Sequence, residues 1–208
     1  RCNGDGTDPE RLSANYLNDF TPSVMQNGRV LYSRWEYVDR PAIPIQSLWS
    51  INPDGTMLQG VFGNRILSPA TFMDAREIPG SGGQILCTLT AHNGPCRGAV
   101  GRIDLARGAN SQVAIRNLTP EVNVGQVDKG DGNFIRGPYL HPWPLDDQRY
   151  LVSKAGAIEL RDYRGQTVET LLPRRGALGF YSPQPVRSRQ REFLVPSQRA
   201  PGSPADAW

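Results

Sequence analysis

Residues 52–56, Asn-Pro-Asp-Gly-Thr, repeat with one change the sequence Asn-Gly-Asp-Gly-Thr of residues 3–7. Both stretches have the composition of a tight turn between strands, because Gly accepts a positive φ and Asp can hydrogen-bond the nearby backbone. Weaker copies of this turn lie at Asp104 and Asp162. A turn that recurs along a chain indicates a repeated structural unit.

Short runs of apolar, β-branched and aromatic residues, the composition of strands, surround each turn. The runs expected to form second strands lie at residues 29–33, 84–88, 150–153 and 193–195. Each follows a segment that opens a unit, at residues 21–23, 68–70, 137–139 and 182–184. Third strands are expected at residues 48–51, 100–103 and 158–160, and outer strands at 59–62, 112–115 and 168–172. Four antiparallel strands in units of about 45 to 50 residues are typical of β-propeller blades.

The sequence therefore predicts an all-β fold, a β-propeller of four-stranded antiparallel blades with three complete blades and half a blade at each end. The predicted propeller segment spans residues 1–199, and a linker-like tail spans 200–208. Its blades lie at about residues 1–14 (partial), 18–62, 66–118, 136–174 and 178–199 (partial). Two arrangements remain open: the chain is part of a larger propeller, or the two half blades complete each other and close a four-bladed ring.

The composition agrees with this fold and argues against several functions. The chain has 22 Gly and 18 Pro and no amphipathic window of helical length, so long helices are not expected. Its formal net charge is only +3 and its like charges form no long blocks, which gives no footprint for a nucleic-acid partner. No apolar run approaches the roughly 18 residues of a membrane span. The three cysteines allow at most one disulfide.

Several of these stretches resemble a known family. Residues 19–24 (Asp-Phe-Thr-Pro-Ser-Val), 27–32 (Asn-Gly-Arg-Val-Leu-Tyr) and 48–56 (Leu-Trp-Ser-Ile-Asn-Pro-Asp-Gly-Thr) resemble a TolB-like blade. Together with residues 137–139 and 181–185, they make nearly the whole chain similar to the propeller domain of hydrazine synthase alpha-subunit-like proteins. That resemblance implies a middle domain of a longer bacterial protein that is periplasmic or secreted. An exported chain would have lost its signal peptide or would carry it upstream.

In that family, c-type haems attached through Cys-x-x-Cys-His motifs carry the redox chemistry. This sequence contains no such motif. We therefore expect no cofactor in this chain, c-type haem in neighbouring domains, and no catalytic residue. The expected partners are the remaining domains of the same protein, other subunits of a larger complex, or a cytochrome.

Propeller geometry places the loops between second and third strands on the same face as the connections between blades. Three long segments, residues 34–47, 90–98 and 119–136, then share one face, and long loops gathered on one face usually carry binding function. We expect a binding face for a protein or cofactor made of Arg34, Trp35, Glu36, Asp39, Arg40, Arg97, Asp128, Asp131 and Arg136.

His92 and Cys96 are the candidates for a contact with a metal or a haem, since they lie close to Cys87 in the sequence. Structural zinc normally has four ligands, and this spacing does not match its common ligand pairs. The alternative is a hydrogen-bonded loop histidine beside a cysteine, Cys87, that packs as an apolar side chain. His141 is expected in a loop on the opposite face.

The sequence thus favours a non-catalytic scaffold or binding domain of a larger, cytochrome-associated periplasmic protein. The alternative is a subunit of a haem-dependent redox enzyme, similar to hydrazine synthase, in which this chain forms a wall of the haem pocket. Haem content of the isolated chain separates the two.

Overall fold

The computed structural model describes residues 1–37, 45–130 and 132–200, and nearly all regular structure in them is β. The first set of strands is β1 (Asn18–Val24), β2 (Val30–Trp35), β3 (Gln46–Ile51) and β4 (Gln59–Phe62). The second set is β5 (Thr71–Glu77), β6 (Gln84–Thr90), β7 (Ala99–Asp104) and β8 (Ile115–Asn117), with the short 3-10 helices η1 (Leu105–Arg107) and η2 (Gln112–Ala114) between β7 and β8. The third set is β9 (Tyr139–Pro144), β10 (Arg149–Lys154), β11 (Ala157–Asp162) and β12 (Thr167–Leu172).

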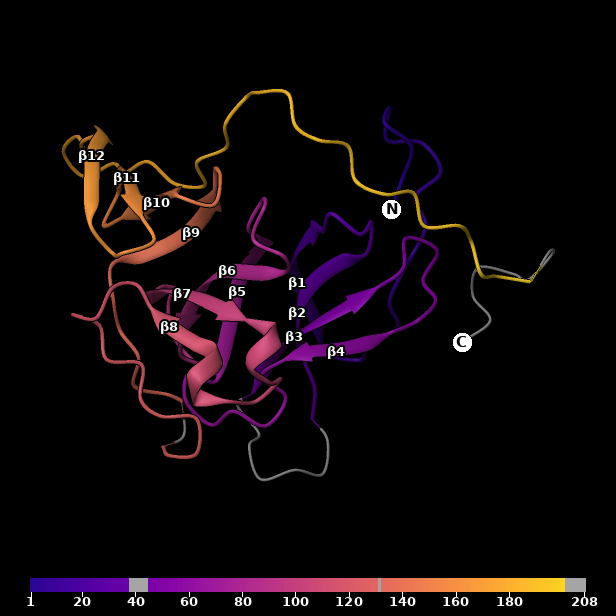
Figure 1. Cartoon of the computed structure of the whole chain (residues 1–208), viewed down its shortest axis with the longest axis horizontal. Coiled ribbons are helices and arrows are strands. Elements are labelled where there is room, and N and C mark those ends of the chain that lie inside the picture. The colour runs from indigo at the N-terminus through magenta and orange to yellow at the C-terminus, as the bar shows by residue number, and fades with distance from the viewer. Residues whose placement is uncertain (38–44, 131, 201–208) are drawn as a thin grey trace.

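Each strand pairs antiparallel with the next strand of its own set. A single parallel pair, Gln46 with Thr71, connects β3 to β5, so the first two sets form one eight-stranded sheet and the third set forms a separate four-stranded sheet. The first strands of the sets lie next to one another, since β1 contacts β5 and β5 contacts β9 (Figure 1). The all-β prediction is confirmed, whereas the number of blades stays a prediction.

The repeated turn takes the same hydrogen bonds in both copies. In residues 3–7 and 52–56 alike, the Asn backbone N donates to the Thr carbonyl at 2.9 Å. In both, the Thr hydroxyl donates to the Asp carboxylate at 2.7 Å. Asp162 organises a similar turn between β11 and β12, where its carboxylate accepts from the backbone N of Gln166 at 2.9 Å. The sequence repeat is therefore a structural repeat.

One apolar core connects all three sets. It includes completely buried side chains of the first set (Leu31, Leu48), of the second set (Phe72, Leu86) and of the third set (Tyr150). Strands β3 and β6 are the most buried, whereas every residue of β12 is exposed. The outer strand of the third set is thus an open edge among the described residues.

A chain of hydrogen bonds links the first strands. Thr21, Asp74 and His141 lie at β-bulges in β1, β5 and β9, and share with Ser182 a positive φ of 47° to 56°. The backbone N of Asp74 donates to Thr21 Oγ1 at 3.1 Å, and the N of His141 donates to Asp74 Oδ2 at 3.3 Å. The N of Ser182 donates to His141 Nδ1 at 3.2 Å. We call these four residues the bulge chain.

Two sequence predictions about the first strands were wrong. Residues 68–70 and 137–139 do not occupy the position of Thr21-Pro22-Ser23, because the bulge chain places Asp74 and His141 there. His141 therefore lies within β9 and not in a loop. In the second set, the outer strand begins at Ile115, and residues 112–114 form η2.

The two expected half blades form no strands in the described residues. At the N-terminal end only the turn of residues 3–7 forms. At residues 193–195 the backbone makes a single backbone hydrogen bond, from Phe193 N to Gln26 O at 3.0 Å, and one bond cannot establish a ladder. The C-terminal segment leaves the third set and runs back to the first set (Figure 1).

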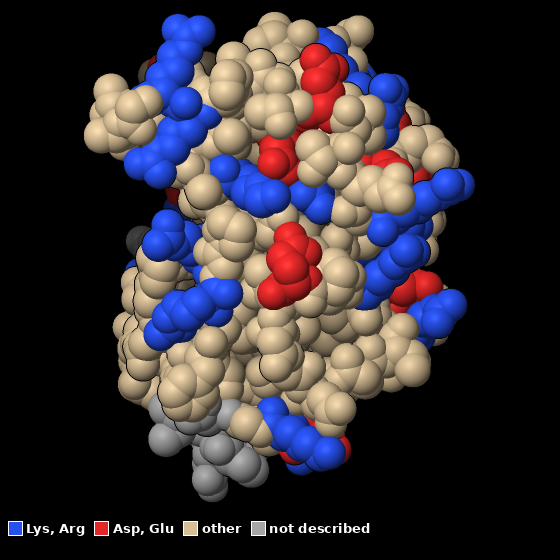
Figure 2. All heavy atoms as spheres, turned by 90° about the vertical axis from the view of Figure 1, so that its left-hand side faces the viewer, with Lys and Arg blue, Asp and Glu red and all other residues tan. Residues whose placement is uncertain are grey.

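The surface of the second and third sets carries its charges in separate patches. Figure 2 shows basic side chains divided by neutral and acidic ones on this side of the molecule. Among the described atoms in this view there is no continuous basic stripe, the usual footprint of nucleic-acid binding. No helix in the described residues is long and apolar enough to cross a membrane.

Candidate functional site

The end of β2 supplies the first residues of the expected binding face. Arg34 Nε lies 2.7 Å from Glu36 Oε1, and its NH1 lies 3.5 Å from Asp19 Oδ2. The guanidinium also stacks over the ring of Trp49, at 5.4 Å from its centroid. Arg34 is buried by these contacts, so Arg34 and Glu36 fix the start of the loop and do not project from it.

An aromatic cluster joins the loop after β2 to the loop after β6. The ring centroids of Trp35 and His92 are 5.0 Å apart, and those of Trp35 and Tyr37 are 5.3 Å apart, both edge to face. Gln46 Nε2 lies 3.0 Å from His92 Nδ1. This contact ties the imidazole of His92 to the first residue of β3.

The segment after β8 meets this cluster from the other side. The backbone N of His92 donates to Gly132 O at 3.3 Å. Arg136 folds over its own segment, where NH1 donates to Asn133 O at 3.0 Å and to Ile135 O at 2.8 Å. Phe134, between them, is 84% exposed, and Tyr37 is 49% exposed. We call residues 35–37, 45–46, 91–98 and 132–136 the loop face.

The structure thus brings together three of the segments named from the sequence. Trp35, Glu36, His92, Arg97 and Arg136 lie on the loop face, and Asp128 is exposed outside it. Asp39, Arg40 and Asp131 lie outside the described residues. Sequence reasoning missed Gln46 and Phe134, although an aromatic residue in a long polar loop is a signal that could have identified Phe134.

The cysteines are separated by the fold. Cys87 is completely buried in β6, and burial raises the pKa of its thiol far above the ordinary value. Its prediction as a packed apolar side chain is confirmed. Cys96 is exposed in the loop after β6, and all three cysteines are free thiols. Within the described ranges, no group of three or more His, Cys, Asp and Glu side chains is arranged to hold a metal ion.

The sequence lacks the motif that attaches a c-type haem covalently. Covalent attachment needs a Cys pair next to an axial His. Cys87 is enclosed in the core, and His92 packs against Trp35 with its Nδ1 taken by Gln46. The loop face combines the exposed rings of Tyr37 and Phe134 with a base held by the Trp35–His92 contact.

Comparison with known proteins shows a fold relationship only. No family model matches the chain, and no curated protein matches it. Among solved structures, hydrazine synthase from Kuenenia stuttgartiensis superposes with a TM-score of 0.64 and 18% sequence identity. The match covers 89% of this chain and 24% of that one, so this chain spans about a quarter of the length of the protein it resembles. At this identity, the likeness establishes a shared fold.

Proposed function

We propose that this chain is a non-catalytic β-propeller scaffold, a binding domain of a larger bacterial periplasmic protein associated with cytochromes. The observation that supports this proposal best is the loop face. Two exposed aromatic rings, Tyr37 and Phe134, stand on segments fixed by the Trp35–His92 contact and by the Arg34–Glu36 ion pair. Aromatic anchors on a preformed base are the residues that carry binding energy in protein interfaces.

The fold likeness to hydrazine synthase supports the same proposal, because the match covers only part of that longer protein. A propeller that forms a fraction of a larger protein contacts the other domains of that protein and can hold them in place. The partner we propose is a haem-carrying domain or subunit that docks on the loop face.

The alternative is a haem-dependent redox subunit in which His92 or Cys96 contacts the cofactor. The contact of Gln46 with His92 Nδ1 favours the scaffold over a haem contact by this histidine. The absorption spectrum of the isolated chain, with pyridine haemochrome and elemental analysis, separates the two. The scaffold proposal predicts no stoichiometric haem or zinc; finding either would overturn it.

The docking role is tested on the natural assembly. The double variant Tyr37→Ala, Phe134→Ala removes both aromatic anchors, and loss of such anchors typically costs about 2 kcal/mol or more each. We expect the variant chain to separate from the haem-containing fraction on size exclusion, while the unchanged chain elutes with it. Leu178→Ala, which truncates an equally exposed apolar side chain of the C-terminal segment, is the control and should stay in the assembly. If the double variant also stays, the loop face is not the docking surface.

A further inference from the structure

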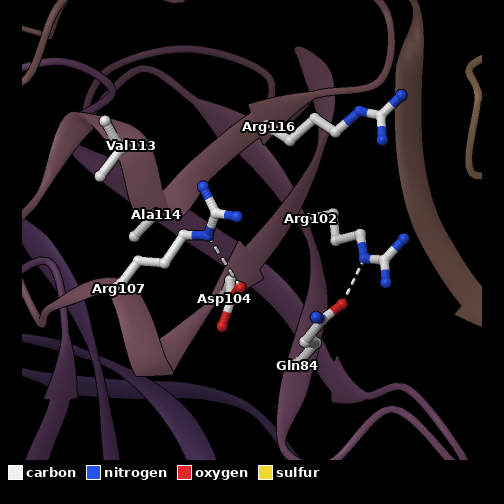
Figure 3. Close-up of a pocket in the computed structure, with 7 residues that line it drawn as sticks. All are labelled: Gln84, Arg102, Asp104, Arg107, Val113, Ala114 and Arg116. Carbon is white, nitrogen blue, oxygen red and sulfur yellow. Dashed lines mark hydrogen bonds and ion pairs between the residues drawn. The ribbon is translucent and has the colours of Figure 1, made fainter.

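A hollow of about 370 Å³ opens on the outer side of the second set, away from the loop face. Strand β7 supplies Arg102 and Asp104, η1 supplies Arg107, and β8 supplies Arg116 (Figure 3). Val113 and Ala114 of η2 form its apolar border. A hollow of this size fits a small molecule.

The hollow holds more positive than negative charge. Arg102 and Arg116 are directly opposite each other in the β7–β8 ladder. Like charges in this position repel, so the pair lowers the stability of the strand pairing unless an anion lies between them. Arg107 adds a third guanidinium, and Asp104 is the one carboxylate among the residues that line the hollow.

The three arginines differ in their partners. Arg102 donates from Nε to Gln84 Oε1 and stacks over the ring of Tyr163 at 5.1 Å, so its position is fixed. Arg107 Nε lies 3.1 Å from Asp104 Oδ2, with its side chain 61% exposed. The side chain of Arg116 has no hydrogen bond or ion pair to any residue that the structure describes. Figure 3 shows its guanidinium on the same side as that of Arg102, whereas the guanidinium of Arg107 lies nearer to Val113 and Ala114.

We propose that this hollow binds a small organic anion, whose phosphate or carboxylate group lies between the facing guanidinium groups of Arg102 and Arg116 and whose remaining part lies toward Arg107, Val113 and Ala114. The planar guanidinium matches both oxyanions through paired hydrogen bonds. Bound charge also removes the repulsion between the facing arginines. Neither the fold likeness nor the loop face accounts for this pocket.

The test is a titration of the folded chain with inorganic phosphate and, separately, with succinate, at constant ionic strength. Side-chain Nε–H resonances of the arginines report binding, and the two titrations distinguish phosphate from carboxylate. We expect saturation with one of them, and at least about tenfold weaker binding by Arg116→Ala, because each charge-assisted hydrogen bond contributes about that factor. Arg116→Lys keeps the positive charge but loses the paired hydrogen bonds of the guanidinium. Its affinity should therefore lie between those of the unchanged chain and of Arg116→Ala.

The control is Arg149→Ala, which removes an exposed arginine of the third set. Arg149 forms an ion pair with Asp146, three residues before it, as Arg107 does with Asp104. The affinity of Arg149→Ala should equal that of the unchanged chain. The unfolding temperature of Arg116→Ala should be equal to that of the unchanged chain or higher, since the substitution removes a repulsion, and this shows that lost binding is not lost folding. Linear, unsaturable shifts, or equal losses in Arg116→Ala and Arg149→Ala, would overturn the site. Saturable binding of an acidic peptide but of neither small anion would also overturn it.

Discussion

Arg161 and Glu159 bring opposite charges into the interior of the third set, where their side chains are 6% and 9% exposed. Arg161 NH1 lies 2.9 Å from Glu159 Oε2 and donates to Tyr139 Oη at 3.2 Å. Tyr139 Oη in turn donates to Glu121 at 2.5 Å. Burial, together with the hydrogen bond to Glu121, raises the pKa of Tyr139 far above the ordinary value, so this hydroxyl stays protonated and remains a donor.

Removing Arg161 leaves the buried Glu159 carboxylate with only the longer ion pair to Lys154, whose Nζ lies 3.6 Å from Glu159 Oε1. We expect Arg161→Met to lower the free energy of unfolding by about 3 kcal/mol, the usual cost of breaking a buried ion pair. The double variant Arg161→Met, Glu159→Gln should recover a substantial part of the loss because no lone charge remains. Urea denaturation measures both. Equal stabilities of the single and double variants would show that the charge of Glu159 is not the cause.

Single residues were the hardest part of the site to predict from the sequence. Residue type suggested that Arg34 and Glu36 project to a partner, but the fold places Asp19 and Trp49 beside Arg34 and buries it. Those contacts are distant along the chain, so local sequence does not report them. The burial of Cys87 was predictable because it lies in an apolar strand.

At the scale of strands, the repeats were predictable and their exact alignment was not. Apolar runs and Asp-Gly turns predicted β2, β3, β6, β7, β10 and β11, because those features are local. The bulge chain was missed because its second member, Asp74, lies in an Asp-Ala-Arg stretch without the proline that follows Thr21, His141 and Ser182. The equivalence is visible only in the shared positive φ and in hydrogen bonds between sets.

The bulge chain makes a prediction about Asp74, which has a φ of 56° and accepts from His141 N and from Thr88 Oγ1. Asp74→Asn keeps an acceptor and a residue type that tolerates this conformation, so its stability should be within about 0.5 kcal/mol of the unchanged chain. Asp74→Ala loses the acceptor and adds backbone strain, and should cost about 2 kcal/mol. Thermal and urea unfolding compare them. If Asp74→Ala proves as stable as Asp74→Asn, the bulge chain does not support the contact between sets.

For the molecule as a whole, the C-terminal segment connects the third set to the first. Phe180 N donates to Gly156 O at 2.9 Å, and further along Gln198 N donates to the buried Asp54 carboxylate at 2.6 Å. Burial raises the pKa of Asp54, whereas the hydrogen bonds from Thr56 and Gln198 lower it. The hydrogen bonds dominate, so the pKa of Asp54 lies well below its ordinary value. Asp54 is the copy of Asp5 in the repeated turn, so one copy of the repeat has become the anchor of this segment.

Two glycines with nearly the same backbone conformation test whether that docking holds the molecule together. Gly28 has a φ of +81° and lies against Phe193, so a β-carbon added at Gly28 would overlap the carbonyl oxygen of Phe193. Gly6 has a φ of +85° and has open space around it. Both Ala substitutions carry the same cost of a positive φ, about 1 kcal/mol or more, so their difference isolates the displaced segment. We expect Gly28→Ala to unfold at a lower temperature than Gly6→Ala. Trypsin should also cleave Gly28→Ala faster at Arg187, Arg189 and Arg191, because the segment is released from the first set. Equal cleavage rates would mean that the segment is not held there in solution.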